Sequence, residues 1–378
     1  MSMKTFKFRI YPTSKQKKSL QKYLDGCRWV YNKTLETRKK SWEDEKKSLS
    51  LYDTQKFIPE WKEIKPELEN IQVHVLRDAQ SRLDKAFKAF FRRIEKRTES
   101  NNKPGYPRFQ GYDRYDSFTF PDGGFKIKDK FLKMSRIGAI RIKQHRPIEG
   151  KIKALTIRRD STGKWFACFV CEVENNFLTK LDKFIGVDVG LINFATFSDD
   201  EKIPNPRFFK ESEKKLAKYQ SKFNKTKKGS FKRKKLKRIV SKIYSKVVNK
   251  RTDFAHKLSR RIVNENQIIV FEKLNIEQMQ QGTFKSIRKS ISNVAWNQFV
   301  NMTTYKAEYA GRQTIFINPR NTSKMCSRCG QIVDKDLSVR THSCPHCGLV
   351  LDRDHNAAIN ILRLGMQSLD NIQKAVCN

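Results

Sequence analysis

Four cysteines near the C-terminus have the spacing of a metal site. They form two Cys-x-x-Cys pairs separated by fourteen residues, namely Cys326, Cys329, Cys344 and Cys347. Two thiolate pairs at this spacing can complete a tetrahedral shell around zinc, and the glycine after each pair lets the backbone turn toward the sulfurs. Because cysteine fills all four positions, no coordination site is left open, so we predict structural rather than catalytic Zn²⁺.

Two acidic residues lie in apolar runs that are typical of buried strands. Asp188 lies in the run FIGVDVGL, and Glu272 ends the run IIVFE. A buried carboxylate without a partner is costly, so each requires a cation or strong hydrogen-bond donors. For either acid alone, a structural ion pair is an equally good explanation. If the two strands are neighbours, however, both carboxylates can converge on one hard cation such as Mg²⁺.

A third carboxylate comes from the segment that follows the last cysteine. Asp354 lies in the first turn of a predicted helix, and with Asp188 and Glu272 it would form a cluster able to hold two Mg²⁺ ions. Such a pair of ions can activate water and stabilise the leaving oxygen of a phosphodiester. Asp352 competes with Asp354 for this role, and its other explanation is a turn or helix cap. We interpret His355 as exposed or structural rather than as a general base.

A further Cys-x-x-Cys pair, Cys168 and Cys171, lies in a predicted strand. Residues three apart in a strand point to opposite faces of the sheet, so these two thiols are poor partners for one metal. We interpret both as packing residues.

The first half of the chain combines short strands with long helices. A strand is predicted over 3–11, and a capping-box pattern at Thr13 and Gln16 predicts that a helix follows. A second amphipathic helix is predicted over 72–97. Alternating runs after the turn-rich segment 101–111 predict antiparallel hairpins, so we expect a β-domain with a helical insertion after its first strand.

The second half, from about residue 183, has the pattern of a mixed or α/β sheet. The segment 207–251 holds nineteen Lys and Arg against two Glu, with apolar residues at helical spacing, which predicts a basic helical hairpin. We expect strands at 184–191, 192–197, 267–274 and 312–319, helices at 252–265, 292–310 and 354–364, and a loose tail at the end.

The composition favours a polyanionic partner. The 378 residues include 80 Lys and Arg against 39 Asp and Glu, a net charge of +41. Such a charge holds nucleic-acid phosphates through counterion release, and the sequence has no long apolar span that would favour a membrane instead. The N-terminus lacks the apolar core of a secretory signal, and cysteines in metal-ligand spacing favour a reducing cytoplasm. A basic composition would also suit a nucleus.

The order of the motifs GVDVG, FEKLN, NPRNTSKMCSRCG, CPHCG and DRDHNAAINI resembles that of the TnpB proteins, which insertion sequences encode and which are relatives of the compact type V CRISPR effectors. The segments KFRIYPTSKQKKSLQKYLDGCRWVYN and LDKAFKAFFRR resemble the opening and the recognition helix of that family. The resemblance covers nearly the whole chain.

This resemblance implies an α+β multidomain fold. An RNase H-like RuvC nuclease domain would contain an inserted zinc ribbon with four cysteine ligands, and an antiparallel β-barrel, the wedge domain, would carry a helical recognition insertion. The implied bounds are 1–11 and 112–180 for the wedge, 12–111 for the recognition lobe, 181–325 and 348–366 for the RuvC-like domain, 326–347 for the ribbon and 367–378 for a flexible tail.

The resemblance also implies an activity. The acidic triad would be Asp188, Glu272 and Asp354, with two Mg²⁺ ions, in an endonuclease that binds a guide RNA, recognises a short motif beside the target in duplex DNA and cleaves that DNA. Guide pairing then reads sequence, so the protein needs mainly backbone contacts and a reader of the short motif. No membrane and no small-molecule cofactor are expected, and the protein would be cytoplasmic and associated with the nucleoid when bound to DNA.

Two alternatives accompany this activity. Some family members have lost triad acids and act as RNA-guided repressors, but this chain keeps all three. A zinc-ribbon DNA-binding protein without RNA is the other alternative. For the helix after residue 72, we predict that Arg77, Gln80 and Ser81 face the DNA motif, the competing interpretation being an ordinary solvated helix face.

Overall fold

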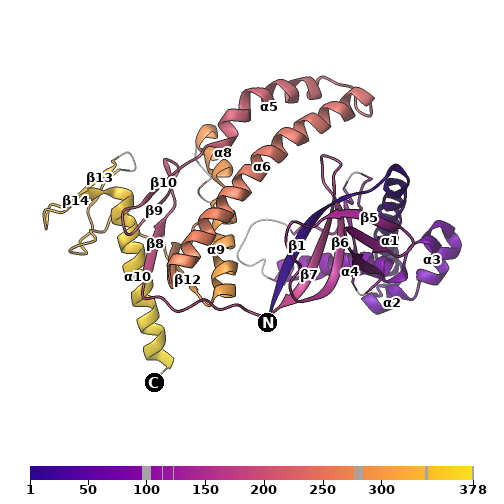
Figure 1. The fold of residues 1–378 in the computed structure, drawn as a ribbon, viewed down its shortest axis with the longest axis horizontal. Helices are drawn as coiled ribbons and strands as arrows, with labels where there is room; N and C mark the ends of the chain where they lie inside the picture. The colour runs from indigo at the N-terminus through magenta and orange to yellow at the C-terminus, as the bar shows by residue number, and fades with distance from the viewer. Residues whose placement is uncertain are drawn as a thin grey trace. The chain divides into compact units, whose positions relative to one another are not determined.

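The computed structural model describes residues 1–95, 104–112, 114–121, 123–275, 279, 284–336 and 339–376. The chain divides into two compact units, Met1–Glu174 and Asn175–Asn378 (Figure 1).

The first unit contains a seven-stranded sheet in the order β2-β6-β7-β1-β5-β4-β3, in which every neighbouring pair is antiparallel. The outer strands β2 and β3 follow one another in the chain, and the rings of Phe120 and Phe125 meet between them with centroids 6.2 Å apart. The sheet is therefore a nearly closed barrel, as predicted. The strands are β1 (Ser2–Tyr11), β2 (Ser117–Phe120), β3 (Phe125–Lys128), β4 (Phe131–Met134), β5 (Gly138–Lys143), β6 (Lys151–Arg159) and β7 (Trp165–Val173).

Strand β7 shows how the alternation of side chains builds the barrel core. Phe169 and Cys171 are buried inside, whereas Cys168 lies on the other face. The interpretation of the two cysteines as packing residues on opposite faces is confirmed. Burial raises the pKa of both thiols, which keeps them protonated and unreactive.

A helical segment is inserted between β1 and β2, as expected. The predicted capping box is present, because the Thr13 hydroxyl accepts the Gln16 N–H while the Gln16 side chain accepts the Thr13 N–H. Residues of the helices and of the barrel form one continuous apolar core, so the insertion is not a separate globule. The helices are α1 (Ser14–Glu45), α2 (Leu51–Gln55), α3 (Ile58–Ile64), the 3₁₀ helix η1 (Pro66–Asn70) and α4 (Val73–Glu95).

The second unit contains a five-stranded mixed sheet in the order β10-β9-β8-β11-β12. Strands β8, β11 and β12 run parallel, and β9 and β10 are antiparallel to their neighbours. A separate two-stranded sheet joins β13 and β14 near the cysteines. The strands are β8 (Phe184–Asp188), β9 (Asn193–Phe197), β10 (Lys202–Pro204), β11 (Ile268–Glu272), β12 (Gln313–Ile317), β13 (Thr341–Ser343) and β14 (Val350–Asp352).

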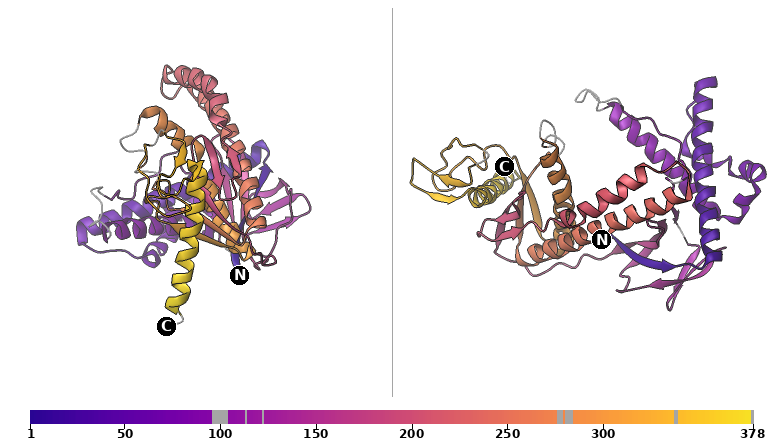
Figure 2. Two further views of the ribbon diagram at one scale, coloured as in Figure 1. Left: turned by 90° about the vertical axis from the view of Figure 1, so that its left-hand side faces the viewer. Right: turned by 90° about the horizontal axis from the view of Figure 1, so that it is seen from above.

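Helices cover both faces of the mixed sheet. Ile185 and Val187 of β8 pack in a cluster with residues of α6 and α9, such as Ile262 and Phe299. On the other face, Val270 of β11 packs with residues of α10. Helices α5 and α6 lie side by side as a hairpin (Figure 2). The helices of this unit are α5 (Phe208–Asn224), α6 (Phe231–Glu265), α8 (Lys285–Val294), α9 (Trp296–Ala310) and α10 (Arg353–Val376).

Gly186 permits a close approach between β8 and α10. A Cβ atom at this position would lie 2.2 Å from the carbonyl oxygen of Ala358 and 2.7 Å from the backbone nitrogen of Leu362. No L-residue with a side chain fits against helix backbone at such distances. Because side chains alternate along a strand, Asp188 lies on the same face as Gly186, toward α10.

Several predicted boundaries are wrong. The strand predicted to reach Leu191 ends at Asp188, and the helix predicted from residue 292 begins at Trp296, after α8 has ended at Val294. The basic hairpin and the following helix at 252–265 were expected as separate elements, but α6 is continuous from Phe231 to Glu265, because no glycine or proline interrupts it and its buried residues keep helical spacing. The tail expected at 367–378 is helical through Val376. Met366 and Leu369 pack beside Val270, so contacts with the sheet extend the helix beyond its predicted end.

The long helices of both units are rich in charged residues. Among the residues that the structure describes, no helix combines the length and the apolar character needed to cross a membrane.

Candidate metal centres

Asp188 and Glu272 end two neighbouring parallel strands. In the register of β8 and β11, Val187 pairs with Phe271, so the next residue of each strand is one of these acids. Adjacent strands lie about 4.8 Å apart, and residues in register point to the same face. The mixed sheet therefore brings the two predicted acids together at one edge, on the face that carries α10.

The pKa of Asp188 shows which charges surround it. Burial raises this pKa well above the usual value, and the carboxylates of Glu272 and Asp354 raise it further. Arg353 acts in the opposite direction, and Asp352 adds a smaller upward contribution. All three predicted triad acids thus belong to one electrostatic environment, in which a cation would relieve their mutual repulsion.

Glu272 is held by a residue that sequence reasoning left unassigned. The Thr322 hydroxyl donates its hydrogen bond to Oε1 of Glu272, and the Pro319 carbonyl oxygen lies 3.1 Å from the same hydroxyl oxygen. Burial raises the pKa of Glu272, and the Thr322 hydrogen bond partly offsets this effect. Thr322 lies after β12 in the quoted motif NPRNTSK, and its type gave no signal beyond that of a common turn residue.

The structure gives Asp352 and Asp354 different partners. Oδ1 of Asp352 accepts the backbone N–H groups of Asp354 at 2.9 Å and His355 at 3.2 Å, which makes Asp352 the N-cap of α10. Its Oδ2 lies 3.0 Å from Nζ of Lys202. The cap explanation of Asp352 is therefore the one the structure supports.

Asp354 faces two guanidinium groups from the first turn of α10. Its Oδ1 accepts hydrogen bonds from Nε and Nη2 of Arg353 at 3.2 and 3.1 Å, and its Oδ2 lies 3.9 Å from Nη1 of Arg340. These cations were not predicted as part of the site. Charge-assisted contacts of this kind position the carboxylate of Asp354.

His355 connects α10 to the turn between β9 and β10. Its Nδ1 lies 3.2 Å from Oδ1 of Asp200, and its Nε2 lies 3.3 Å from the carbonyl oxygen of Ser198. Both ring nitrogens thus face groups of this turn, which agrees with the structural interpretation of the residue.

The three carboxylates are less tightly grouped than the cysteines. Within the described part of the chain, the four cysteines are the only set of three or more His, Cys, Asp or Glu residues whose ligand atoms all lie within 4.8 Å of one another. The three acids are not grouped this closely, and one of them, Asp354, contacts Arg353 and Arg340. Their all-oxygen donor set still suits Mg²⁺.

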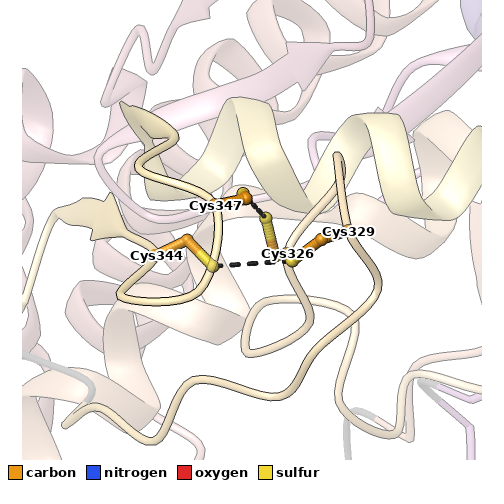
Figure 3. Close-up of side chains that lie close together, drawn as sticks. All are labelled: Cys326, Cys329, Cys344 and Cys347. Carbon is orange, nitrogen blue, oxygen red and sulfur yellow. Dashed lines mark hydrogen bonds between the residues drawn. The ribbon is translucent and has the colours of Figure 1, made fainter.

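The four predicted cysteines converge at one point (Figure 3). The sulfurs of Cys326 and Cys347 are 3.6 Å apart, as are those of Cys329 and Cys344. Four sulfurs at the corners of a tetrahedron around zinc would stand about 3.8 Å apart, given Zn–S bonds of about 2.3 Å. The cluster can therefore hold a metal ion, and its geometry fits zinc.

The two cysteine pairs share one backbone design. The N–H of Gly330 donates to the Cys326 carbonyl at 2.9 Å, and that of Gly348 donates to the Cys344 carbonyl at 3.0 Å. Both glycines have positive φ, 80° and 69°, which a residue with a side chain adopts at a cost. The prediction that these glycines turn the backbone is confirmed.

The thiols influence one another's ionisation. Burial opposes ionisation of Cys326, but the amides of Cys329 and Arg328 and the His342 side chain outweigh it and lower the pKa to about 5. The Leu349 amide lowers the pKa of Cys347, but burial and the three neighbouring thiols raise it to about 12. The cluster thus favours ionisation of one thiol and opposes ionisation of all four, and a bound cation would stabilise the four thiolates together.

His342 supports the cluster from β13. It is completely buried, and its Nδ1 lies 2.6 Å from Nζ of Lys335. A lysine ammonium only donates, so Nδ1 accepts and the ring proton is on Nε2. Nε2 is buried and has no hydrogen-bond partner among the described residues, but the imidazole lowers the pKa of Cys326. Polar groups beside a metal ligand help to orient it and to tune its basicity. Sequence reasoning did not select this histidine.

Two buried asparagines connect α10 to the segment that enters the first cysteine pair. Asn356 accepts the Ser327 N–H at 2.9 Å and donates to the Met325 carbonyl at 2.8 Å. Asn360 donates to the carbonyl oxygens of Thr322 and Met325 at 2.9 and 2.7 Å. The helix that carries Asp354 is therefore tied both to the metal cluster and to the threonine that holds Glu272.

Of the three residues of α4 that were predicted to face DNA, one is buried. Arg77 is exposed and Ser81 is half-buried, with its hydroxyl donating to the Arg77 carbonyl at 3.0 Å. The placement of Gln80 on the polar side is wrong, because its side chain is completely buried and Nε2 donates to the Thr54 carbonyl at 2.7 Å. Gln80 occupies the α2-facing side of α4, where an amide satisfies a buried carbonyl.

Three family models match separate parts of the chain. The model described as "Probable transposase" matches residues 168–283, the "Cas12f1-like, TNB domain" model matches residues 296–361, and a "Helix-turn-helix domain" model matches residues 1–47. In this structure, residues 1–47 contain β1 and the single continuous helix α1.

Known proteins match nearly the whole chain. A protein of Streptomyces pristinaespiralis, named "Putative RNA-guided DNA endonuclease", is 32% identical over 371 residues, which cover 96% of this chain and 89% of the relative. The protein InsQ of Escherichia coli K12, given the same description, is 26% identical, with 96% and 92% covered. The solved structure of the mini-RNA-guided endonuclease CRISPR-Cas phi3 has a TM-score of 0.54 at 11% identity, covering 96% of this chain and 92% of that one.

The barrel with inserted helices and the mixed sheet define an α+β fold that the chain shares with this solved structure. Within that fold class, the chain belongs to the TnpB family.

Replacing Asp188 should stabilise the protein in the absence of Mg²⁺. Folding raises the pKa of Asp188, so the folded state binds a proton on this carboxyl more tightly than the unfolded state does. The folded state therefore loses stability as the pH rises above about 4, the pKa of an aspartate in an unfolded chain. Thermal unfolding should show that Asp188→Asn raises the Tm at neutral pH, with the gain shrinking as the pH falls toward that value. The matched control Asp253→Asn, at an exposed position, should show no gain. An unchanged Tm for Asp188→Asn at neutral pH would contradict this expectation.

Removing His342 should weaken the cysteine cluster. His342 lowers the pKa of Cys326, and loss of such an outer partner of a metal ligand typically lowers metal affinity by about 10- to 100-fold, so His342→Ala should lose zinc to a competing chelator at lower concentration. His346→Ala, which removes an exposed histidine inside the second cysteine pair, is the control. Equal zinc retention by both variants would show that His342 does not support the cluster.

Proposed function

We propose that this protein is an RNA-guided DNA endonuclease whose cleavage site is formed by Asp188, Glu272 and Asp354. The observation that carries the proposal is the shared electrostatic environment of these three acids at one sheet edge, in a chain with a net charge of +41. Acids at such a point act against nucleic-acid binding unless a cation joins them to the phosphate. The names of the two relatives, both putative RNA-guided DNA endonucleases, support the same activity.

The arrangement of the mixed sheet supports a RuvC, RNase H-like nuclease domain. Its order, β10-β9-β8-β11-β12 with β9 antiparallel to β8, places the first acid on the central strand and the second on the adjacent parallel strand. The third acid lies on α10, which packs on the same face. Under this proposal, the four cysteines hold a structural zinc within an inserted ribbon, and the barrel and its helices act as wedge and recognition lobe.

Each residue of the site has a role that follows from its contacts. Asp188, Glu272 and Asp354 would hold Mg²⁺, which when bound supplies activation of water and stabilisation of the leaving oxygen. Thr322 fixes Oε1 of Glu272, and the Asp352 cap fixes the first turn of α10. Arg353 and Arg340 hold Asp354 and offer guanidinium groups to the phosphate that is cut.

The partners of this activity are a guide RNA and duplex target DNA. The excess of lysine and arginine supports contacts with phosphates, and pairing with the guide would supply the sequence specificity. A zinc site built from thiolates and a nucleic-acid substrate together support a cytoplasmic location, with association to the nucleoid during target binding.

Arg77, with Ser81 beside it, is proposed to face the DNA motif next to the target. Arg77→Ala should relax the dependence of cleavage on that motif while leaving guide RNA binding unchanged, because an arginine reads base edges through paired hydrogen bonds. Lys85→Ala, which removes another exposed cation of α4, is the matched control and should keep motif dependence. Unchanged motif preference in Arg77→Ala would assign the residue to the solvated face of the helix.

The two neighbouring aspartates provide the sharpest test of the nuclease site. Asp354→Asn should abolish cleavage of a motif-bearing plasmid by the protein with its guide RNA in Mg²⁺, because it removes one carboxylate of the triad. Asp352→Asn should cleave at close to the wild-type rate and lose at most about 1 kcal/mol of stability, since asparagine caps helices as well as aspartate does. RNA binding should be equal in both variants.

The same experiment separates the competing functions. If wild type binds its target without cutting it, and Asp354→Asn behaves identically, the protein is a guided repressor rather than a nuclease. If the purified protein carries no discrete RNA, the interpretation as a DNA-binding protein without a guide is favoured instead.

A further inference from the structure

A cavity of about 720 Å³ lies at the base of the α5–α6 hairpin. It is lined by the start of α5, the middle of α6, and parts of α8, α9 and β9, and we refer to it as the root cavity. Its volume falls within the range of sites for small organic ligands. None of the metal-site residues described above lines it.

The root cavity and the acids lie on opposite faces of the mixed sheet. Phe194, Phe254 and Ala255 of its wall pack in the cluster that α6 and α9 form with Ile185 and Val187. Asp188 lies on the other face of β8, toward α10. The root cavity is therefore distinct from the proposed cleavage site.

Aromatic rings dominate the root cavity. Phe208 and Phe209 at the start of α5 are both half-buried, so each keeps ring surface in contact with the open space. The ring of Phe208 contacts that of Phe254 edge to face, with centroids 6.0 Å apart. Nζ of Lys289 lies 5.3 Å from the centroid of Phe209. Rings in such surroundings are suited to stacking against a flat heteroaromatic group.

Positive charge surrounds these rings. Arg207, Lys210, Arg251 and Lys289 line the root cavity, and Glu213, the one acid among its described lining residues, forms an ion pair with Lys289. The hairpin that extends from the cavity, residues 214–249, contains fifteen Lys and Arg and no Asp or Glu. A purely apolar ligand would not require this charge, whereas a group that combines a flat ring with phosphate would match both features.

We propose that the root cavity binds one unstacked nucleotide of a nucleic-acid strand whose neighbouring phosphates lie on the α5–α6 hairpin. The base stacks on Phe209, and Arg207 and Lys210 contact the adjoining phosphates. This inference rests on the proposed nucleic-acid function and adds a second contact site to it, away from the cleavage centre. Either the guide RNA or a DNA strand of the target can supply such a nucleotide.

The test uses the full-length protein with short single-stranded oligonucleotides that carry one 2-aminopurine base, in a DNA series and an RNA series. Wild type should change the fluorescence of the probe, because the base leaves the stack of its neighbours to enter the cavity. Phe209→Ala should abolish this change and weaken oligonucleotide binding by roughly tenfold, the effect expected when one base loses its aromatic partner. A signal with RNA only assigns the nucleotide to the guide, and a signal with DNA only assigns it to the target.

Two further variants make the result specific. Phe231→Ala removes a ring that is 84% exposed at the start of α6, outside the cavity but within the same basic hairpin, and should leave the signal unchanged. Asp188→Asn should lose cleavage and keep the signal, so failure of the nuclease proposal and failure of this one are distinguishable. Equal signals and affinities for wild type and a folded Phe209→Ala variant, in both series, would overturn the proposal. Unfolding temperatures of the two proteins establish that the variant is folded.

Discussion

The close contact between β8 and α10 at Gly186 is the constraint on which the candidate nuclease centre depends. A side chain at this position would collide with the backbone of α10, so only glycine allows the helix to lie against the strand. Asp188 follows two residues later on β8, and Asp354 lies in the first turn of α10. Their distance is therefore set by the packing of backbone against backbone, which is stiffer than contact between long side chains.

The cysteine cluster acts on the same helix through hydrogen bonds. Asn356 and Asn360 form hydrogen bonds with the segment 322–327. This segment contains Thr322, which donates a hydrogen bond to Glu272, and Cys326, which belongs to the cluster. Buried amides that lose these partners would each cost about 1–3 kcal/mol, so the arrangement resists sliding of α10 along the sheet. A metal at the cysteines would thus serve as a scaffold for acids that it does not touch.

Charge is divided between the two faces of the second unit. On the α10 face, acids meet at the edge of the sheet, and a few arginines hold one of them. On the α6 face, residues 214–249 of the hairpin, which contain no Asp or Glu, extend from an aromatic cavity. Under the proposed function, the hairpin that binds phosphates and the acidic cleavage site therefore lie on opposite faces of one sheet.

The sequence by itself determined those features that depend on short-range spacing. The four cysteines, the glycines that follow them, the capping box at Thr13 and the strands that carry Asp188 and Glu272 all follow from residues within a few positions of one another. Tertiary structure decided the rest. Asp352 and Asp354 are two residues apart and chemically identical, and only the orientation of α10 makes one a cap and turns the other toward the acids. Gln80 was predicted on a solvated face, but the structure buries it against α2. Helix α10 extends past its predicted end because Met366 and Leu369 pack against the sheet. Burial by a distant segment leaves no periodic trace in the local sequence, so these features could not be predicted from it.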